Sequence, residues 1–185
     1  MAIVILGKTP CAISGRIVSK TDKVLCLPPF PATLNDPAAV CSDACILRDE
    51  FEKWEFRDNV VRLVKEFWVQ QHNTSEAFTV LHEDNEYLMA KGEVEAKTRI
   101  LFLKHAFVID IPQEIWQDFR GQLLGIEDAV SICPYSTIAL SFNKRVDKME
   151  ICIEFQGGGK DCIELSRPEW SRFQSVLTTM EPVLG

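Results

Sequence analysis

Apolar and polar positions change their period at about residue 74. From Ala77 onward they alternate with a period of two, which is typical of half-buried β-strands. The alternating runs are broken at short polar or glycine positions, and the simplest arrangement for the first four is an antiparallel meander. The strands predicted in this way are 77–83, 86–96, 98–103, 106–111, 137–143, 148–155 and 161–165. A glycine-rich turn at 156–161 is expected to join the last two.

Three segments have helical spacing instead. Asp58 can cap a helix whose buried face carries Val61, Val64, Phe67 and Trp68, with His72 at its polar exit. Two later helices, 112–125 and one beginning at Ser166, each follow a strand and have a proline in the first turn. Both repeat the spacing Trp-x-x-Phe-x-x-x-Leu, which puts three large side chains on one helical face. The residues concerned are Trp116, Phe119, Leu123, Trp170, Phe173 and Leu177.

The first part of the chain is less regular. We expect a β-hairpin from Gly15–Ser19 and Lys23–Leu27, then an irregular proline-rich loop at 28–37. Ser42 or Asp43 can cap a helix that runs to about Trp54. The fold class predicted from the whole pattern is α+β, a mostly antiparallel sheet with packed helices. The expected domains are 1–74 and 75–185, or one continuous domain.

Four cysteines crowd into the first part: Cys11, Cys26, Cys41 and Cys45. Four thiolates can hold a structural zinc ion, but a zinc knuckle needs two ligands about two to four residues apart, and position 14 is a serine. Buried structural thiols are the alternative interpretation. Whether these four cysteines retain a metal is left open by the sequence, and no metal ligand is assigned.

The runs CAISGRI, LPPFPATLNDP and CSDACILRDEF resemble a bacterial treble-clef-type zinc segment, C-x-x-C-G-[KR]-x-I followed by an Asn-x-Asp-Pro loop and S-D-A-x-x-H-x-x-C. The matching residues are Cys11, Gly15, Arg16, Ile17, Phe30, Asn35, Asp36, Pro37, Ser42, Asp43 and Ala44. Ser14, Leu47 and Glu50 stand at the other ligand positions. The resemblance, over about residues 11–51, implies a short treble-clef-like unit that keeps the shape without the metal.

Composition narrows the functional classes. The net charge of −7 and the pI near 5.0 argue against a nucleic-acid surface and favour a basic partner. Seven cysteines without regular spacing predict free, mostly buried thiols rather than disulfides, and hence a cytoplasmic protein. No apolar run approaches the roughly 18 residues of a membrane span, so no membrane association is expected.

Carboxylates and aromatic residues are interleaved between residues 49 and 58. This pattern suits a surface that binds a basic protein, because charge speeds encounter and aromatic side chains supply affinity. The alternative is a solvated helix whose aromatic residues face inward. The candidate partner-binding residues are Asp49, Glu50, Glu52, Trp54, Glu55 and Asp58.

Catalytic motifs are weak. The histidines, His72, His82 and His105, have no recognisable nucleophile beside them in sequence, and Gly157–Gly159 lack the Gly-Lys-Ser/Thr ending of a phosphate loop. We therefore expect a non-enzymatic binding protein without a cofactor. Its character resembles that of bacterial immunity proteins, which implies inhibition of a basic toxin domain, such as a nuclease, by occlusion of its active site. A metal-binding or enzymatic domain that uses the N-terminal cysteines is the alternative.

Overall fold

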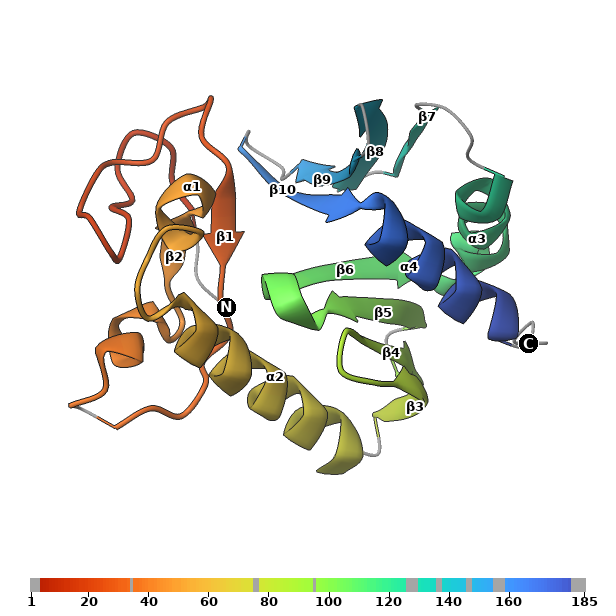
Figure 1. Cartoon of the computed structure of the whole chain (residues 1–185), viewed down its shortest axis with the longest axis horizontal. Helices are drawn as coiled ribbons and strands as arrows, with labels where there is room; N and C mark the ends of the chain where they lie inside the picture. Colours follow the sequence, from red (N-terminus) through yellow and green to blue (C-terminus); the bar gives the residue numbers. More distant parts are fainter. Residues whose placement is uncertain are drawn as a thin grey trace.

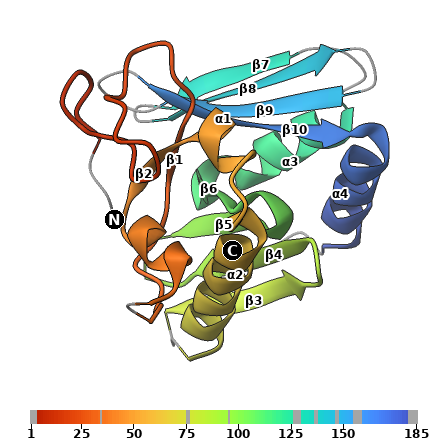
Figure 2. The same cartoon turned by 60° about the vertical axis from the view of Figure 1, so that its left-hand side comes forward.

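A computed structural model describes residues 4–33, 35–74, 77–94, 96–125, 130–135, 138–145, 148–154 and 159–180. Within them the predicted α+β class is confirmed, since helices accompany sheets whose strands are all antiparallel. The N-terminal part contains β1 (Val24–Cys26), the 3-10 helix η1 (Pro37–Cys41), β2 (Cys45–Leu47), α1 (Arg48–Phe51) and α2 (Arg57–Thr74). Figures 1 and 2 show these elements grouped at one side of the molecule.

The predicted hairpin of Gly15–Ser19 with Lys23–Leu27 is wrong. The strand β1 pairs with β2 instead, with Leu25 opposite Ile46, and Ile17 bridges Pro10. All three residues of β2 are buried, so this pairing gives β1 an apolar partner that the polar segment before it does not offer. A turn does form at the expected place, where Asp22 accepts hydrogen bonds from Ser19.

The predicted helix from Ser42 or Asp43 to Trp54 is also wrong. Ser42 ends η1, and its hydroxyl donates to the Phe30 carbonyl, so its side chain does not cap a following helix. Asp43 has a positive φ of 51°, which interrupts regular structure. Residues 45–47 then enter the ladder with β1, and only the four residues of α1 are helical before the chain turns.

Helix α2 forms with a similar span to the predicted one, and the predicted residues Val61, Val64, Phe67 and Trp68 do pack against the core. It begins at Arg57, two residues before the predicted first helical residue, and its most buried apolar residues are Val60, Leu63 and Val64, whereas Val61 is half-buried. His72 was expected at a polar exit but is buried, with its ring against Phe78 at 4.6 Å between centroids. The helix therefore inserts its C-terminal end against the sheet that follows.

The predicted meander is confirmed. Strands β3 (Phe78–Glu83), β4 (Tyr87–Gly92), β5 (Lys97–Phe102) and β6 (Phe107–Pro112) pair in sequence order, all antiparallel. Alternation gives the sheet two faces. One buries Leu88 and Leu101, together with Leu103 just after β5, beneath the aromatic side of α2, and the other carries Tyr87, Met89, Ile100 and Phe102 into the main core.

The second half forms another antiparallel sheet. It contains β7 (Val130–Tyr135), β8 (Ile138–Arg145), β9 (Lys148–Glu154) and β10 (Lys160–Ser166), of which β7 was not predicted. Pro112 ends β6, and a 3-10 helix η3 (Gln113–Ile115) precedes α3 (Trp116–Gly125), so the helix starts later than predicted. The predicted glycine turn lies mostly outside the described residues.

Helices α3 and α4 (Arg167–Thr179) pack with the two sheets into one core, as Figure 1 shows. The predicted Trp, Phe and Leu triplets of both helices are all buried in it, so the inward helical faces were predicted correctly. The capping box of α4 also forms, since the Ser166 backbone N–H donates to Glu169 at 2.8 Å.

The expectation of free thiols is wrong for one pair. Cys152 on β9 and Cys162 on β10 form a disulfide. The two residues lie directly opposite each other in the ladder, with their Cα atoms 4.1 Å apart, which brings the side chains into bonding range. Sequence spacing alone did not reveal this register. Cys11, Cys26, Cys41 and Cys45 are free.

Buried residues gather into two main clusters. One contains residues between Cys11 and Val64 together with Ala106, and the other extends from Tyr87 to Met180. Ion pairs connect the two parts. Lys23, the residue before β1, contacts Glu150 on β9 at 2.7 Å and also forms a parallel bridge with Lys160 on β10. None of the helices in the described residues is long and apolar enough to cross a membrane.

The main connection is a buried ion pair. Arg48, the first residue of α1, donates two hydrogen bonds to Asp161 on β10, at 2.8 and 2.6 Å, and a third to the His105 carbonyl at 2.6 Å. Arg48 and Asp161 are 4% exposed each. Burial alone would lower the pKa of Arg48, but the Asp161 carboxylate outweighs it and raises that pKa above its ordinary value. Burial raises the pKa of Asp161, against the opposing effect of Arg48. The bidentate contact fixes α1 against the second sheet.

We expect the Arg48→Met and Asp161→Leu variants each to lose about 3–5 kcal/mol of unfolding free energy, because each leaves a buried charge without its partner. The double variant should lose clearly less than the sum, since it leaves neither charge behind. Urea unfolding of the four proteins measures the coupling. Additive losses would show that Arg48 acts through its other contacts.

A second polar contact joins the meander to α4. Asp84, between β3 and β4, accepts from the backbone N–H groups of Glu86 and Tyr87 and from Arg172 of α4. Burial alone would raise the pKa of Asp84, but these hydrogen bonds lower it to about 2. The ionised carboxylate therefore stabilises the folded protein above the unfolded pKa, and this contribution is lost as the pH falls through the folded pKa.

Asp84→Asn should lower the unfolding free energy at neutral pH by about 2 kcal/mol and flatten its decline between about pH 4 and pH 2. The amide still accepts from the two N–H groups, so the difference reports the charge. Unfolding curves across this pH range measure it. The exposed carboxylate of Asp118 on α3 provides a control, and Asp118→Asn should keep the wild-type pH profile. Parallel curves for Asp84→Asn and the wild type would contradict the assignment.

Candidate functional site

The acidic segment, residues 49–58, lies on the surface at the start of the N-terminal helices. It comprises most of α1, a turn and the first two residues of α2. Asp49, Glu52, Glu55 and Asp58 are exposed, and the Asp58 side chain is 95% accessible. Glu55 has no hydrogen bond or ion pair to any described residue. The segment therefore presents carboxylates to solvent from a short, turning backbone rather than from the single helix that was predicted.

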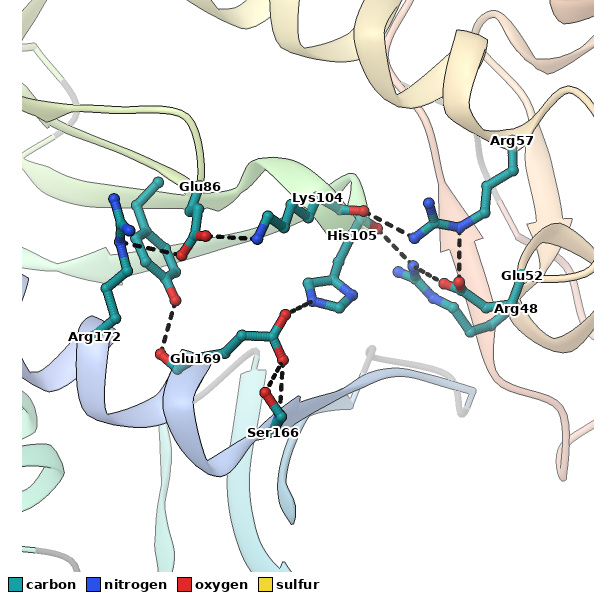
Figure 3. Close-up of polar contacts among 10 residues, drawn as sticks. Arg48, Glu52, Arg57, Glu86, Lys104, His105, Ser166, Glu169 and Arg172 are labelled. Atoms are coloured by element: carbon teal, nitrogen blue, oxygen red, sulfur yellow. Dashed lines mark hydrogen bonds and ion pairs between the residues drawn. The ribbon is translucent and has the colours of Figure 1, made fainter. Parts of the chain in front are cut away.

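Two arginines fix this backbone, as Figure 3 shows. Arg48 donates to the carbonyl oxygen of His105, and Arg57 donates to that of Lys104 at 2.9 Å. Both carbonyls belong to η2 (Leu103–His105), the short turn between β5 and β6. Glu52 lies between the two guanidinium groups, 3.4 Å from Arg48 and 2.8 Å from Arg57. The acidic segment is thus held at both ends to the meander.

The four positions of the treble-clef-like ligand set converge. The Cys11 thiol donates to Glu50 at 3.1 Å, and the Leu47 backbone N–H donates to the Cys11 sulfur at 3.4 Å. Ser14 and Arg16 also donate hydrogen bonds to Glu50. Burial alone would raise the pKa of Glu50, but these donors lower it. The Glu50 carboxylate therefore accepts hydrogen bonds from the side chains at two of the other three positions, Cys11 and Ser14.

The N-terminal cysteines are not arranged as one ligand set. All four lie in the described part of the chain, and no three of them have their sulfur atoms within 4.8 Å of one another. Cys26 and Cys45 face each other across β1 and β2, while Cys41 is buried and burial raises its pKa to about 12. The described residues contain another potential ligand group, Glu150 with Cys152 and Cys162, but its two sulfur atoms are joined in the disulfide.

Aromatic side chains of the segment divide between core and surface. Phe51 is fully buried, whereas Trp54 and Phe56 are half-buried and contact each other edge to face, with centroids 5.4 Å apart. Trp54 packs against the N-terminal core with one side. The exposed residue Glu55 follows Trp54 directly in the chain, so aromatic and acidic residues are neighbours here.

A cleft of about 430 Å³ adjoins the segment at Asp58. It lies between α2, η2 and the start of α4. Its charged lining is mainly cationic and consists of Arg57, Arg62, Lys65 and Lys104 against Asp58 and Glu169. Three of these cations are held in ion pairs, Arg57 with Glu52 and Asp58, Arg62 with Glu66, and Lys104 with Glu86, so their charges are largely balanced by neighbouring carboxylates.

The histidines have different environments. His72 contacts the Trp68 carbonyl at 2.6 Å within the core, and His82 lies 3.2 Å from Asp84. His105 borders the cleft, with Nε2 3.9 Å from Glu169, and burial lowers its pKa. Within the described residues, none of the three histidines forms a hydrogen bond with a Ser or Cys side chain, so the geometry supplies no pair of nucleophile and base there.

Sequence reasoning placed the candidate residues near one another, but it treated them as equivalent. The structure separates them: Glu50 is engaged with Cys11, Glu52 with two arginines, and Asp49, Glu55 and Asp58 face solvent. Sequence reasoning missed Arg48 and Lys104. Arg48 follows directly after the buried residues Ile46 and Leu47, and a charge at the end of an apolar run was the available signal of a buried ion pair.

Comparison with known proteins adds no further constraint, because no family model, curated protein or solved structure matches the chain. Function must therefore be inferred from the residues themselves.

We expect Glu50→Ala to lower the unfolding free energy by about 1–3 kcal/mol, because the Cys11, Ser14 and Arg16 donors lose a partly buried acceptor. Asp49→Ala is the matched control, one residue away and exposed, and it should stay within about 0.5 kcal/mol of the wild type. Urea denaturation measures both. Equal effects of the two substitutions would show that Glu50 does not organise the loop around Cys11.

Proposed function

We propose that the protein is a non-enzymatic binding protein whose acidic segment engages a basic partner protein. The observation that carries the proposal is the arrangement of Asp49, Glu55 and Asp58, which are exposed carboxylates on a backbone that Arg48 and Arg57 hold in place. A surface ordered before binding loses little conformational entropy on association, so its charges contribute more fully.

The partner surface should be basic where it faces these carboxylates. Oppositely charged surfaces accelerate association, and the net charge of −7 adds a long-range attraction of the same sign. Trp54 and Phe56 provide aromatic area beside the carboxylates, which is the kind of contact that supplies affinity at interfaces.

The concrete form of the proposal is a bacterial immunity protein. A toxin nuclease carries cationic groups that bind phosphates, and carboxylates such as Asp49 and Glu55 can occupy those groups and block the active site. Inhibition would follow from occlusion, with no chemical step by this protein.

For the test, the partner is first isolated by co-purification with the full chain and identified by mass spectrometry. The variant Asp49→Lys/Glu55→Lys should slow association on the order of tenfold at low ionic strength and flatten its salt dependence, because two attractive charges become repulsive. Both side chains are exposed, so folding should be retained. Stopped-flow or surface-based kinetics across a salt series measure the effect.

The matched control is Glu114→Lys/Asp118→Lys, which changes the net charge equally at η3 and α3, at the other end of the molecule in Figure 1. It should have a much smaller effect on association. Equal slowing by both double variants would reduce the effect to overall charge, and unchanged kinetics for Asp49→Lys/Glu55→Lys would remove the segment from the interface. Loss of the partner's nuclease activity on binding would support the immunity form, and a partner without such activity would contradict it.

A further inference from the structure

Cys26 and Cys45 lie directly opposite each other in the β1–β2 ladder, and their sulfur atoms are 3.8 Å apart. The disulfide between Cys152 and Cys162 joins residues in the same relation across β9 and β10. Directly opposed residues of an antiparallel pair have their Cβ atoms about 4.5–5.5 Å apart, which is close to the separation in a disulfide. Bond formation between Cys26 and Cys45 therefore needs only a small approach of the two strands.

The surroundings of the two thiols differ from those of the other free cysteines. Cys26 is half-buried and Cys45 is 5% exposed, so the pair has access to solvent from the Cys26 side. Cys11 donates to Glu50, and Cys41 is fully buried. Cys26 and Cys45 are the free thiols in the described residues that have each other as a hydrogen-bonding partner.

Their contact also favours a thiolate. The two sulfur atoms share a hydrogen bond in which either can be the donor, and this bond lowers the pKa of Cys45 despite the opposing effect of burial, whereas burial raises the pKa of Cys41 to about 12. The thiolate is the form that reacts with oxidants, so Cys45 should react first and Cys26 should resolve the product.

We propose that Cys26 and Cys45 form an oxidisable dithiol that hydrogen peroxide converts to a disulfide between β1 and β2. In the first step the Cys45 thiolate attacks one peroxide oxygen, the O–O bond breaks and hydroxide leaves, which gives a sulfenic acid at Cys45. In the second step the Cys26 sulfur attacks the Cys45 sulfur, the S–O bond breaks and the hydroxyl leaves as water with the Cys26 proton. Peroxide is reduced to two waters as the two thiols are oxidised.

The disulfide would close a loop of the chain that contains the proline-rich segment and η1. Closing a loop restricts the unfolded chain, so oxidation should raise the melting temperature. It would also fix the first residue of β2, and β2 leads directly into Arg48 and the acidic segment. The dithiol rests on the β1–β2 register and does not depend on the proposed binding function.

The test treats the reduced full chain with hydrogen peroxide and follows it by non-reducing peptide mapping and intact mass. We expect a linkage between the Cys26 and Cys45 peptides with the loss of two hydrogens. Cys45 should react at least about tenfold faster than Cys41 in the folded protein, and this difference should disappear in urea. A linkage of Cys45 to Cys11 or Cys41, or the absence of any linkage at Cys45, would overturn the proposal.

Two variants separate the steps. With Cys26→Ser, oxidation should stop at a Cys45 sulfenic acid that dimedone traps, because the resolving sulfur is missing. Cys41→Ser is the matched control and should form the Cys26–Cys45 linkage at the wild-type rate. If Cys26→Ser fails to fold, the peptide map and the comparison of folded and unfolded wild-type protein still test whether Cys26 and Cys45 form a selective dithiol. Equal rates for Cys45 and Cys41 in the folded protein would refute a selective dithiol.

Discussion

The buried pair of Arg48 and Asp161 is the contact on which the rest of the arrangement depends. Its two charges come from the N-terminal part and from β10, and neither is tolerated in the core without the other. Because Arg48 also donates to the His105 carbonyl, one guanidinium joins α1, the second sheet and the meander. An apolar contact would tolerate sliding, whereas this bidentate geometry fixes orientation. The positions of the exposed carboxylates of residues 49–58 therefore depend on the Arg48–Asp161 pair.

The sequence predicted the elements whose signals are local. The Trp116 and Trp170 triplets repeat at helical spacing, the alternation from Ala77 predicts the strands of the antiparallel meander, and Ser166 with Glu169 forms the expected cap. Sequence-based prediction failed for the elements whose structure depends on a partner far along the chain. Residues 45–47 form a strand because they pair with β1 and bury their apolar side chains. Local capping signals at Ser42 could not reveal that pairing. The Cys152–Cys162 register was hidden for the same reason.

The candidate site shows the same difference between features with local signals and features that depend on distant residues. Clustered carboxylates and aromatic residues are visible in sequence, so the acidic segment could be located, but which carboxylates are free depends on partners far along the chain. Glu50 is held by Cys11, and Asp161 lies more than one hundred positions from Arg48. The cleft beside Asp58 could not be predicted at all, because α2, η2 and α4 contribute to it from separate parts of the sequence.

The short strand β2 connects the two inferences drawn from the N-terminal part. Its first residue is Cys45, its last is Leu47, and the next residue is Arg48. Oxidation of Cys45 would therefore act on a segment already fixed at its other end by the buried ion pair. A constraint added to a segment that is already ordered mainly restricts the unfolded chain and local opening, with little change in the folded position of its neighbours. The disulfide should thus keep the acidic segment in its present geometry under oxidising conditions rather than rearrange it.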